Sequence, residues 1–499
     1  MTGKLRSLNL RIGSVTMRKI FFRADGNAKM GLGHVIRSLA LADMLKDQFH
    51  CEFIIRNPHD SLKRQIKELC HTIHVIPETT ADLKEVEFIA NNLLSGDEIV
   101  VLDGYHFRTE YQNAIKRNGA KLVCIDDIYE YHFYADVIIN HAGGVSKEHY
   151  SKEAHTQVCL GPEYALLRKP FRDLANNSIA YPKGEHHVFI CLGGADPKND
   201  TLKVLQACEN LDPRYTYHVV TGSAYQYKVE LKEYVGQSPL SIHHYSNLSA
   251  LEMAKTMAKC ASAITSPSGI AYEYLSTGGT LFLVKIADNQ NGPYNYYLKN
   301  KVARDFYQEL ELSSKTNGFP ISFLGYSTKS KLIDGQQSKR YMRLFQALTL
   351  SVRPANETDC LLYYEWANDP DVRRQSYSSH DISFDEHEKW FFEKILDKDY
   401  RMFVVEKAGK AIGQIRFSLN AGIATISYGL DKNYRGQGLG VSLLRIGCSE
   451  LKKEIANIQI IGFVKKSNIP SSKAFEEIGS FKEEAKEYKD SFKYTILAL

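Results

Sequence analysis

The stretch KIFFRADGNAKMGLGHVIRSLAL, residues 19–41, contains the pattern that decides the fold of the first part of the chain. An apolar run of strand length comes first, a loop with several glycines follows, and an amphipathic helical pattern begins directly after the loop. The same succession of strand-like and helical segments continues through the first two thirds of the sequence. Strands that alternate with helices form right-handed βαβ units, so this pattern predicts parallel sheets covered by helices.

The alternation falls into two successive blocks, which predict two α/β domains. We expect the first over residues 17–170 and the second, together with a connecting segment, over residues 171–347, after an N-terminal extension of residues 1–16. Open α/β sheets bind ligands at the carboxyl ends of their strands. The two blocks therefore predict a ligand-binding cleft lined by strand ends from both domains.

The pattern changes near residue 348, and residues 348–499 predict a third domain. The segment RMFVVEKAGKAIGQIRFSLNAGIATISYGLD, residues 401–431, is typical of three antiparallel strands joined by short turns at Ala408-Gly409 and at residues 420–422. A glycine-rich turn, a helix, a strand, a second helix and a final strand follow. This order predicts a separate C-terminal α/β domain.

The composition is that of an ordinary globular protein: among 499 residues, 43% are hydrophobic and 24% are charged, and the formal net charge is only +5. These values exclude a disordered chain and give no support for nucleic acid or a membrane surface as a partner. No apolar run approaches the length of a transmembrane helix. The nine cysteines include no C-x-x-C pair, so we expect free thiols in a cytoplasmic protein. No metal-ligand spacing occurs either, which predicts chemistry without a metal.

The first candidate site is a histidine at the predicted start of a helix. Gly31 and Gly33 precede His34 and leave backbone N–H groups open to an anionic ligand. The positive end of the helix dipole disfavours imidazolium, so we expect the pKa of His34 to fall and its neutral imidazole to accept a proton from water. Arg37 lies one turn further on and suits a phosphate or a carboxylate. Asp25 either orients the imidazole or caps the loop before the helix.

Two glycine-containing strand-to-helix junctions in the second block predict a site for a nucleoside diphosphate. Glycines at these junctions allow the backbone to approach phosphate closely, and the helix that follows offers N–H donors. Thr221, after another strand, is a candidate for a contact near the base or the ribose. The predicted diphosphate contacts are Gly193, Gly194, Ser268 and Gly269.

The segment RADGNAKMGLGHVIRSLALA, residues 23–42, resembles the signature of PseG-type nucleotide-sugar hydrolases of pseudaminic acid biosynthesis, which are relatives of GT-B glycosyltransferases. The resemblance extends over about 330 residues and implies a GT-B-like pair of Rossmann-type domains. The further motifs that carry it, in chain order, are VLDGY (101–105), CIDDI (124–128), LGPEYALLRKPF (160–171), LGGADPKN (192–199), ADNQ (287–290) and LIDG (332–335).

This resemblance implies hydrolysis of UDP-2,4-diacetamido-2,4,6-trideoxy-β-L-altropyranose, in which water displaces UDP from the anomeric carbon with inversion. It assigns the activation of water to His34 and places Tyr105 and Asn289 in the same pocket. Asp103, in the motif that contains Tyr105, is expected among the substrate-binding residues. Glu273 is similar to a glutamate that takes the ribose hydroxyls in GT-B relatives.

The sequence RGQGLG, residues 435–440, resembles the coenzyme A loop of GNAT acetyltransferases, which form a C-terminal GNAT α/β domain here. The resemblance implies acetyl-CoA as co-substrate, with its pyrophosphate held by successive backbone N–H groups. Asn468 matches an asparagine that contacts the pantetheine arm. Many members carry a tyrosine near Phe475 that protonates the leaving thiolate, so Tyr428 or water is the candidate for that role here. The predicted acetyl-CoA contacts are Arg435, Gly436, Gln437, Gly438, Leu439, Gly440 and Asn468.

Together the two resemblances imply a bifunctional enzyme. The GNAT domain would acetylate N4 of the UDP-4-amino sugar precursor, and the hydrolase would then release UDP from the product. One alternative is a GT-B glycosyltransferase that moves the sugar of a UDP-sugar to an acceptor. A second keeps the hydrolase but gives the GNAT domain a protein, an antibiotic or another amine as acceptor. A third is a nucleotide-sugar sensor that binds without turnover.

Overall fold

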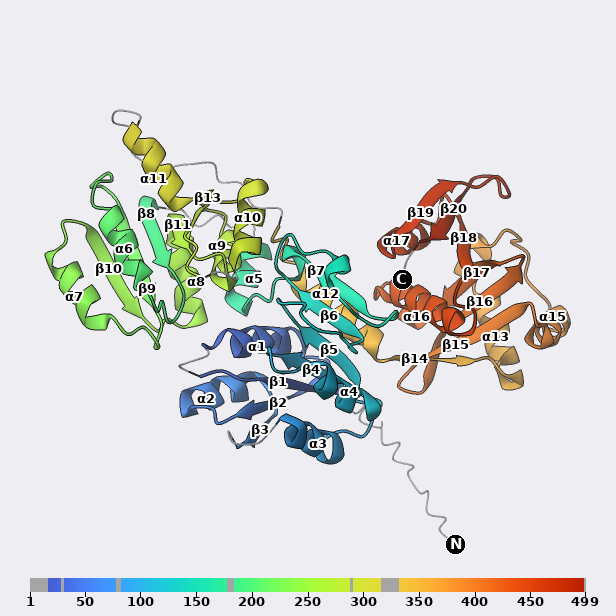
Figure 1. The fold of residues 1–499 in the computed structure, drawn as a ribbon. Helices are drawn as coiled ribbons and strands as arrows, with labels where there is room; N and C mark the ends of the chain where they lie inside the picture. Colours follow the sequence, from blue (N-terminus) through green and yellow to red (C-terminus); the bar gives the residue numbers. More distant parts are fainter. Residues whose placement is uncertain are drawn as a thin grey trace, which may run out of the picture. The chain divides into compact units, whose positions relative to one another are not determined.

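The computed structural model describes residues 17–27, 31–77, 82–176, 184–287, 290–315 and 332–497. The chain forms two compact units, Met1–Ser338 and Lys339–Leu499 (Figure 1). The described part of the first unit contains two parallel sheets, and that of the second contains a mixed sheet. This confirms the predicted fold class, in which two parallel α/β assemblies are followed by a C-terminal α/β domain.

The first sheet is parallel, with the strand order β3-β2-β1-β4-β5-β6-β7. The change of direction after β3 places α1 and α2 on one face and α3 and α4 on the other, because βαβ crossovers are right-handed. The apolar run of β1 becomes buried beneath these helices. The elements are β1 (Lys19–Ala24), α1 (Gly33–Leu45), β2 (His50–Arg56), α2 (Asp60–Leu69), β3 (Thr72–Ile76), α3 (Asp82–Asn92), β4 (Ile99–Asp103), α4 (Thr109–Arg117), β5 (Lys121–Ile125), β6 (Val137–Asn140) and β7 (Gln157–Leu160).

The second sheet is also parallel and has the order β10-β9-β8-β11-β12-β13. Helix α12 (Gln337–Leu348) follows this sheet and spans the boundary between the two units. The elements before it are α5 (Lys169–Asn176), β8 (Gly184–Cys191), α6 (Asp200–Ala207), β9 (Thr216–Thr221), α7 (Lys228–Gln237), β10 (Ser241–Ser246), α8 (Ala250–Lys259), β11 (Cys260–Thr265), α9 (Gly269–Leu275), β12 (Thr280–Leu283), α10 (Asn291–Lys299), β13 (Arg304–Asp305) and α11 (Phe306–Lys315).

Each parallel sheet has a switch point, where two neighbouring strands are followed by connections that run in opposite directions. In the first sheet β1 and β4 flank the switch point, and in the second sheet β8 and β11 flank it. Loops after such strand pairs diverge and leave room for a ligand at the carboxyl edge of the sheet. The topology therefore predicts that ligand-binding residues lie in the loops that follow these four strands.

The second unit contains a mixed sheet with the order β14-β15-β16-β17-β18-β20-β19. The three predicted antiparallel strands are confirmed as β15, β16 and β17. Positive φ angles of 50° and 71° at Ala408-Gly409, and of 47° and 80° at Ala421-Gly422, suit the two-residue turns that match strand twist. The elements are β14 (Leu350–Pro354), α13 (Cys360–Ala367), α14 (Pro370–Gln375), α15 (Phe384–Leu396), β15 (Tyr400–Lys407), β16 (Lys410–Asn420), β17 (Ile423–Leu430), α16 (Leu439–Glu454), β18 (Gln459–Lys465), α17 (Ile469–Glu477), β19 (Ser480–Glu484) and β20 (Ser491–Ile496).

The parallel strands β17 and β18 diverge along their length. Their pairing ends at Ile426 and Gly462, although β17 continues to Leu430 and β18 continues to Lys465. We call the gap in pairing between residues 427–430 and 463–465 the strand opening. The backbone groups that face each other across this gap do not form hydrogen bonds between the two strands.

The two faces of this sheet carry different helices. Ile415 and Phe417 of β16 pack in one hydrophobic cluster with residues of α16 and α17. Met402 and Val404 of β15 pack in another cluster with residues of α13 and α15. Side chains alternate between the faces of a strand, so the residues between these positions point to the opposite face.

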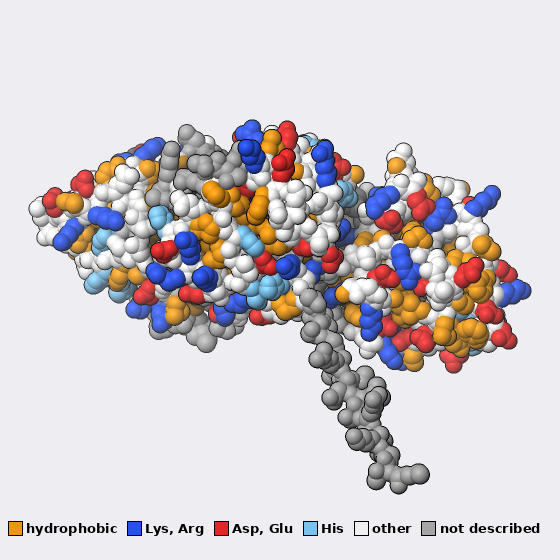
Figure 2. All heavy atoms as spheres, turned by 90° about the horizontal axis from the view of Figure 1, so that it is seen from below, with side chains coloured by type: hydrophobic (Ala, Val, Ile, Leu, Met, Phe, Trp, Pro, Cys, Tyr) orange, Lys and Arg blue, Asp and Glu red, His pale blue; other side chains and the backbone are white. Residues whose placement is uncertain are grey.

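All nine cysteines are buried and free, as predicted. Within the described ranges, no helix combines the length and the apolar character needed to cross a membrane. In the same ranges no group of three or more His, Cys, Asp or Glu side chains is placed to hold a metal ion. On the face drawn in Figure 2, acidic and basic side chains are interspersed on each unit.

Candidate active sites

The first candidate site lies at the switch point of the first sheet. Helix α1 begins at Gly33, so His34 stands in its first turn, and Nδ1 of His34 lies 2.6 Å from Oδ1 of Asp103 at the end of β4. An ionised carboxylate only accepts hydrogen bonds, so this contact puts the imidazole proton on Nδ1 and leaves the lone pair on Nε2. The arrangement suits His34 to accept a proton through Nε2.

Arg37 holds Asp103 in its ionised form. The Nε atom of Arg37 donates to Oδ2 of Asp103 over 2.7 Å, and its Nη2 donates to Oδ1 over 2.6 Å. Its Nη1 also donates to Asp127 over 3.1 Å. Burial alone would raise the pKa of Asp103, but the charge and hydrogen bonds of Arg37 hold that pKa below its usual value. Of the two partners predicted for Arg37, phosphate or carboxylate, the structure shows carboxylates.

The carboxylate that contacts His34 is that of Asp103, and the prediction that Asp25 orients the imidazole is wrong. Asp25 accepts hydrogen bonds from Arg23 over 2.6 and 2.7 Å, and from the backbone N–H of Arg56 over 2.8 Å. Arg23 is fully buried, and a buried guanidinium requires carboxylate partners. The need to neutralise Arg23 therefore takes Asp25 away from His34.

The structure brings Tyr105 to the imidazole. The two rings meet edge to face, with centroids 5.0 Å apart and an interplanar angle of 85°, and Tyr105 is 43% exposed. Burial, and then the negative charge of Asp127, raise the pKa of Tyr105 and keep its hydroxyl protonated. Asn289, predicted in the same pocket, lies outside the described residues.

His141 is a site residue that the sequence analysis missed. It follows the last residue of β6, and its Nδ1 is buried without a hydrogen-bond partner in the described part of the chain. Burial, and then the positive charge of Arg37, lower the pKa of His141 to about 4, so its imidazole is neutral at pH 7. The available signal was its position at a strand end, where parallel sheets gather ligand-binding groups.

Two contacts join the strand ends of the first sheet to helices of the second. The hydroxyl of Tyr272 on α9 donates to the backbone oxygen of His141 over 2.7 Å. A Cβ atom at Gly143 would lie 2.1 Å from Cδ1 of Tyr296 on α10, so only glycine fits there. These contacts place α9 beside the residues that surround His34.

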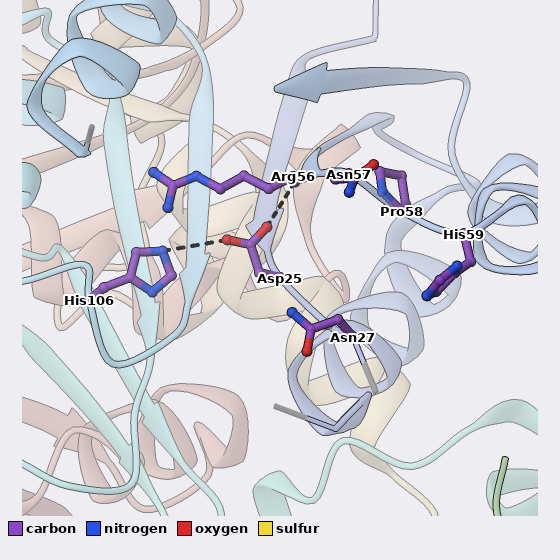
Figure 3. Close-up of a pocket in the computed structure, with 8 residues that line it drawn as sticks. Asp25, Asn27, Arg56, Asn57, Pro58, His59 and His106 are labelled. Carbon is purple, nitrogen blue, oxygen red and sulfur yellow. Dashed lines mark hydrogen bonds and ion pairs between the residues drawn. The ribbon is translucent and has the colours of Figure 1, made fainter. Parts of the chain in front are cut away.

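A pocket of about 400 Å³ lies at the carboxyl ends of β1 and β2. Figure 3 shows His106 and Asp25 on one side of it and His59 on another, with His106 Nε2 3.6 Å from Asp25 Oδ2. Burial, and then the charge of Arg23, lower the pKa of His106. The lining is polar and mixed in charge, and consists of Asp25, Gly26, Asn27, Arg56, Asn57, Pro58, His59 and His106.

The glycines predicted to contact a diphosphate lie at the switch point of the second sheet. Gly193 and Gly194 follow β8, and Gly269 begins α9 after β11. A Cβ atom at any of these three glycines would meet nothing within 4 Å, so their backbones face open space. Gly222 packs on this loop, because its Cβ would lie 2.5 Å from the oxygen of Gly194. Ser268 is the N-terminal capping residue of α9, and its hydroxyl lies 3.0 Å from that of Ser266.

Two other residues predicted to contact the nucleotide, Glu273 and Thr221, form hydrogen bonds within the protein. Glu273 is 8% exposed, and its two oxygens accept hydrogen bonds from Arg168, each over 2.7 Å. Thr221 is buried, and its hydroxyl lies 3.0 Å from Nε2 of His244. Both side chains are therefore already hydrogen-bonded to protein groups.

The second candidate site is the loop between β17 and α16. Gly436 and Gly438 have φ angles of +75° and +78°, which disfavour any residue with a side chain. Leu439 begins α16 and is buried in the core, so it anchors the loop. The side chain of Gln437 donates to the backbone oxygen of Asn433 over 3.0 Å. Gly440 lies against Tyr428, because a Cβ atom at Gly440 would be 3.9 Å from Cε2 of Tyr428. The backbone N–H groups at this helix start are arranged for an anion.

The side chain of Arg435 forms hydrogen bonds within the protein, so a phosphate contact at this residue would fall to its backbone N–H. Its Nη1 donates to Asp369 over 2.8 Å and to Asp371 over 3.0 Å. Its Nε donates to the backbone oxygen of Leu430 over 3.1 Å. Because Asp369 and Asp371 lie at the start of α14, the guanidinium group holds this helix against the loop.

Tyr428 stands beside the strand opening. Its hydroxyl donates to Oγ of Ser471 over 3.2 Å, and burial raises its pKa. Asn468 caps α17, since its Oδ1 accepts from the backbone N–H of Ser471 over 3.2 Å. The ring of Phe475 meets that of Tyr428 at 72° with centroids 6.0 Å apart. The structure thus brings together Tyr428, the start of α17 and the glycine loop.

Residues 349–480 match the family model described as an acetyltransferase (GNAT) domain. The GNAT match begins one residue before β14 and ends at the start of β19. A spermidine N-acetyltransferase from Vibrio cholerae, solved with CoA and spermine, is 21% identical over 30% of this chain and 96% of that chain, with a TM-score of 0.28.

One similar protein matches nearly the whole chain, and two others match only part of it. An uncharacterized protein of Methanocaldococcus jannaschii, MJ1062, is 25% identical over 96% of this chain and 99% of its own length. The spore coat polysaccharide biosynthesis protein SpsG of Bacillus subtilis is 23% identical over 65% of this chain and 97% of its own. The UDP-2,4-diacetamido-2,4,6-trideoxy-β-L-altropyranose hydrolase of Campylobacter jejuni is 27% identical over 37% of this chain and 64% of its own. Both predicted resemblances, to PseG-type hydrolases and to GNAT domains, are confirmed.

Proposed function

We propose that this chain catalyses two consecutive steps on a UDP-sugar of pseudaminic acid biosynthesis. The GNAT domain acetylates N4 of the UDP-4-amino sugar precursor with acetyl-CoA. The first unit then hydrolyses UDP-2,4-diacetamido-2,4,6-trideoxy-β-L-altropyranose to UDP and the free sugar, with inversion. The observation that carries the proposal is the contact between Nδ1 of His34 and Asp103, which leaves a basic Nε2 at the switch point of the first sheet.

In the hydrolytic step, Nε2 of His34 takes a proton from water as the water oxygen forms a bond to the anomeric carbon. The bond between that carbon and the diphosphate oxygen breaks, and its electron pair leaves with UDP. A diphosphate is a good leaving group, so one general base is enough and no carboxylic acid is needed to protonate it. The open backbones of Gly193, Gly194 and Gly269 support a diphosphate at the second sheet.

Tyr105 and Asn289 are proposed to line the sugar pocket beside His34. His141 adds a neutral imidazole to the same site, with a buried Nδ1 that has no partner in the described ranges. An uncharged ring there places no second positive charge next to Arg37. We assign Asp103 and Arg37 to positioning, because both contact His34 or each other.

In the acetyl transfer step, backbone N–H groups of residues 436–440 bind the pyrophosphate of acetyl-CoA. The amine nitrogen of the acceptor forms a bond to the acetyl carbon and releases one proton to solvent, and the bond from that carbon to sulfur breaks with its electron pair on sulfur. Tyr428 then gives its proton to the departing thiolate, because its raised pKa keeps the hydroxyl protonated until the thiolate forms. We propose that Asn468, which caps the start of α17, contacts the pantetheine arm.

The test is to incubate the full chain with the UDP-4-amino sugar and acetyl-CoA and to identify the products by mass spectrometry. We expect the N4-acetylated UDP-sugar first, then UDP and the free diacetamido sugar. Without acetyl-CoA, the same incubation leaves the UDP-4-amino sugar unacetylated. Acetyl-CoA consumption only with peptides or other amines would contradict the coupled function. UDP release only with an added sugar acceptor would instead favour a glycosyltransferase.

Replacing Tyr428 with phenylalanine is expected to lower kcat for acetyl transfer about a hundredfold, because the leaving thiolate loses its proton donor. The KM for acetyl-CoA should stay within about twofold, since the glycine loop is intact. Tyr434→Phe is the matched control, because Tyr434 also packs on the same core but lies in the turn before the loop. Thiol release, followed with a thiol reagent, measures both variants. Equal rates in the two would remove Tyr428 from the mechanism.

A further inference from the structure

Among the described residues of the second unit, three cationic side chains gather without a carboxylate partner. Arg373 lies on α14, Arg416 lies on β16, and Lys465 ends β18. We call these residues the cationic cluster. Ser376 connects two of them, because its Oγ accepts from Arg373 over 3.2 Å and its backbone oxygen accepts from Lys465 over 2.6 Å. The cluster thus draws together a helix, the loop after it and a strand end.

In the described part of the chain, the positive charges of this cluster form no ion pair. Among the described residues, no carboxylate lies within ion-pair distance of Arg373, Arg416 or Lys465, whose hydrogen bonds go to backbone and hydroxyl oxygens. The Nε atoms of both arginines are buried and have no acceptor in the described ranges. Other arginines of the same unit are paired with carboxylates, namely Arg353, Arg374, Arg401 and Arg435.

Like charges brought together under partial burial are costly unless an anion joins them. Burial, and then the positive charge of Arg416, lower the pKa of Arg373, which shows that the two guanidinium groups act on each other. The negative charge that acts on Arg373 is that of Asp381, beyond ion-pair distance. A ligand with negative charge would relieve this repulsion and supply acceptors for both Nε atoms.

The cluster lies at the strand opening, on the face opposite the glycine loop and α16. Ile415 and Phe417, the neighbours of Arg416 on β16, pack against α16, so Arg416 points the other way. Its Nη2 donates to Oγ of Ser427, the first residue of β17 beyond the paired part. Lys465 stands on the far strand of the opening. Acetyl-CoA at the glycine loop and an anion at the cluster would therefore approach the opening from opposite faces.

The sheet offers room between these two positions. Gln414, two residues before Arg416, shares its face and is 5% exposed, and its Oε1 has no hydrogen-bond partner in the described part of the chain. Gly429, which pairs with Gln414 across the strands, would meet nothing within 4 Å if it carried a Cβ. A buried acceptor beside open space is suited to the N–H groups of an amine substrate.

An aromatic surface adjoins the cluster. The rings of Tyr377 and Tyr488 stack at 17° with centroids 4.1 Å apart, and these residues are 49% and 39% exposed. The ammonium group of Lys465 lies 5.8 Å from the centroid of Tyr377. Partly exposed aromatic rings next to cations are a common way to bind a nucleobase that carries phosphate.

We infer that the acetyl acceptor of the GNAT domain is a nucleoside diphosphate derivative, whose phosphates bind Arg373, Arg416 and Lys465 and whose base stacks on Tyr377 and Tyr488. The inference rests on the proposed function and deepens it, because it names the residues that bind the nucleoside diphosphate part of the acceptor. The acceptor amine then lies over Gly429 and Gln414, next to the thioester carbon. Recognition of the diphosphate excludes simple amines from efficient transfer.

The test compares Arg373→Gln and Arg416→Gln in the full chain. We expect the KM for the UDP-4-amino sugar to rise about 10- to 100-fold in each variant, since a charge-assisted hydrogen bond is lost. The KM for acetyl-CoA should not change, which distinguishes the acceptor phosphates from those of coenzyme A. Arg374→Gln is the matched control, because Arg374 is adjacent and exposed and pairs with Asp371. Arg416→Lys should recover part of the affinity.

Further measurements separate recognition from a structural effect. With a 4-amino sugar that lacks UDP, the variants and the unmodified chain should have the same kcat/KM. In the unmodified chain, the KM for the UDP-4-amino sugar should rise with salt, whereas that for the free amino sugar should not. Unchanged KM values for the UDP-4-amino sugar in both variants would overturn the inference.

Calorimetric titration with UDP distinguishes failure of the inference from failure of the proposed function. We expect two UDP sites in the unmodified chain, one in each unit, and a single site in the double variant Arg373→Gln/Arg416→Gln. If the chain does not acetylate the UDP-4-amino sugar but the double variant still loses a site, the proposed reaction fails and the binding site stands. If the double variant keeps the same number of UDP sites as the unmodified chain, the cluster is not a phosphate site.

Discussion

Replacing His34 with glutamine is expected to lower kcat for UDP release about a thousandfold, because the hydrolytic step loses its general base. Glutamine keeps a polar side chain of similar length at the first turn of α1, so the helix start and the ion pair between Asp103 and Arg37 remain. UDP should still bind, since the open glycine backbones that support it lie on the second sheet. The effect therefore falls on kcat and leaves KM nearly unchanged.

The measurement follows UDP formation from the diacetamido UDP-sugar with a coupled assay, and UDP affinity by calorimetry. His132→Gln is the matched control, because His132 lies on the surface beside Ser151 and Glu153. Asp103→Asn should also lower kcat, since a neutral amide no longer fixes the proton on Nδ1. Normal turnover by His34→Gln would show that another group activates the water.

Replacing Glu85 with alanine is expected to reduce the free energy of unfolding of the first unit by about 4 kcal/mol. Glu85 is buried on α3, where it accepts from Nε of Arg23 over 2.6 Å and from the hydroxyl of Tyr111 over 2.7 Å. Its removal leaves the guanidinium of Arg23, which is fully buried, with Asp25 as its remaining carboxylate partner. An incompletely paired charge in the interior costs more than the lost hydrogen bonds.

Urea denaturation, followed by a signal from the first unit, measures this loss, and Glu87→Ala on the exposed side of the same helix is the control. Burial alone would raise the pKa of Glu85, but hydrogen bonds from Arg23 lower it below the ordinary 4.5. A carboxyl group whose pKa is lower in the folded than in the unfolded state stabilises the fold. This contribution is complete above the unfolded pKa and is lost as pH falls through the folded pKa. The difference between the variant and the unmodified chain should thus shrink below about pH 4.5. A loss no larger than that of Glu87→Ala would contradict the argument.

Local signals made much of the architecture predictable. Apolar runs that alternate with helical patterns anticipated the parallel sheets, and glycines at Ala408-Gly409 and Ala421-Gly422 marked the two hairpins. The edge strand β19 was not anticipated, because its sequence SFKEE shows little alternation of apolar residues, although all five of its residues pair with β20. The pattern of a short, charged edge strand resembles that of a loop.

The sequence analysis found His34 but chose the wrong carboxylate for it. Ala24, next to Asp25, pairs with Asp103 across the sheet, so two carboxylates end neighbouring strands at nearly the same level. Which of them meets the imidazole depends on Arg23 and Glu85, which are 62 residues apart in the chain. The side chain of Arg435 illustrates the same limit, because its partner Asp369 lies 66 residues away. Pairings of this kind are decided by tertiary packing and leave no local signal.

The tight fit of Gly143 against Tyr296 bears on how the proposed hydrolase could be re-engineered. A methyl group at residue 143 would collide with that ring, so any wider side chain must displace α10 or the strand end that carries His141. If the part of the first unit that forms one sheet were exchanged for its counterpart from a distant homologue, the spacing between His34 and the diphosphate would therefore change, even if both parts folded. Successful chimeras should retain this glycine and its aromatic neighbour as a matched pair.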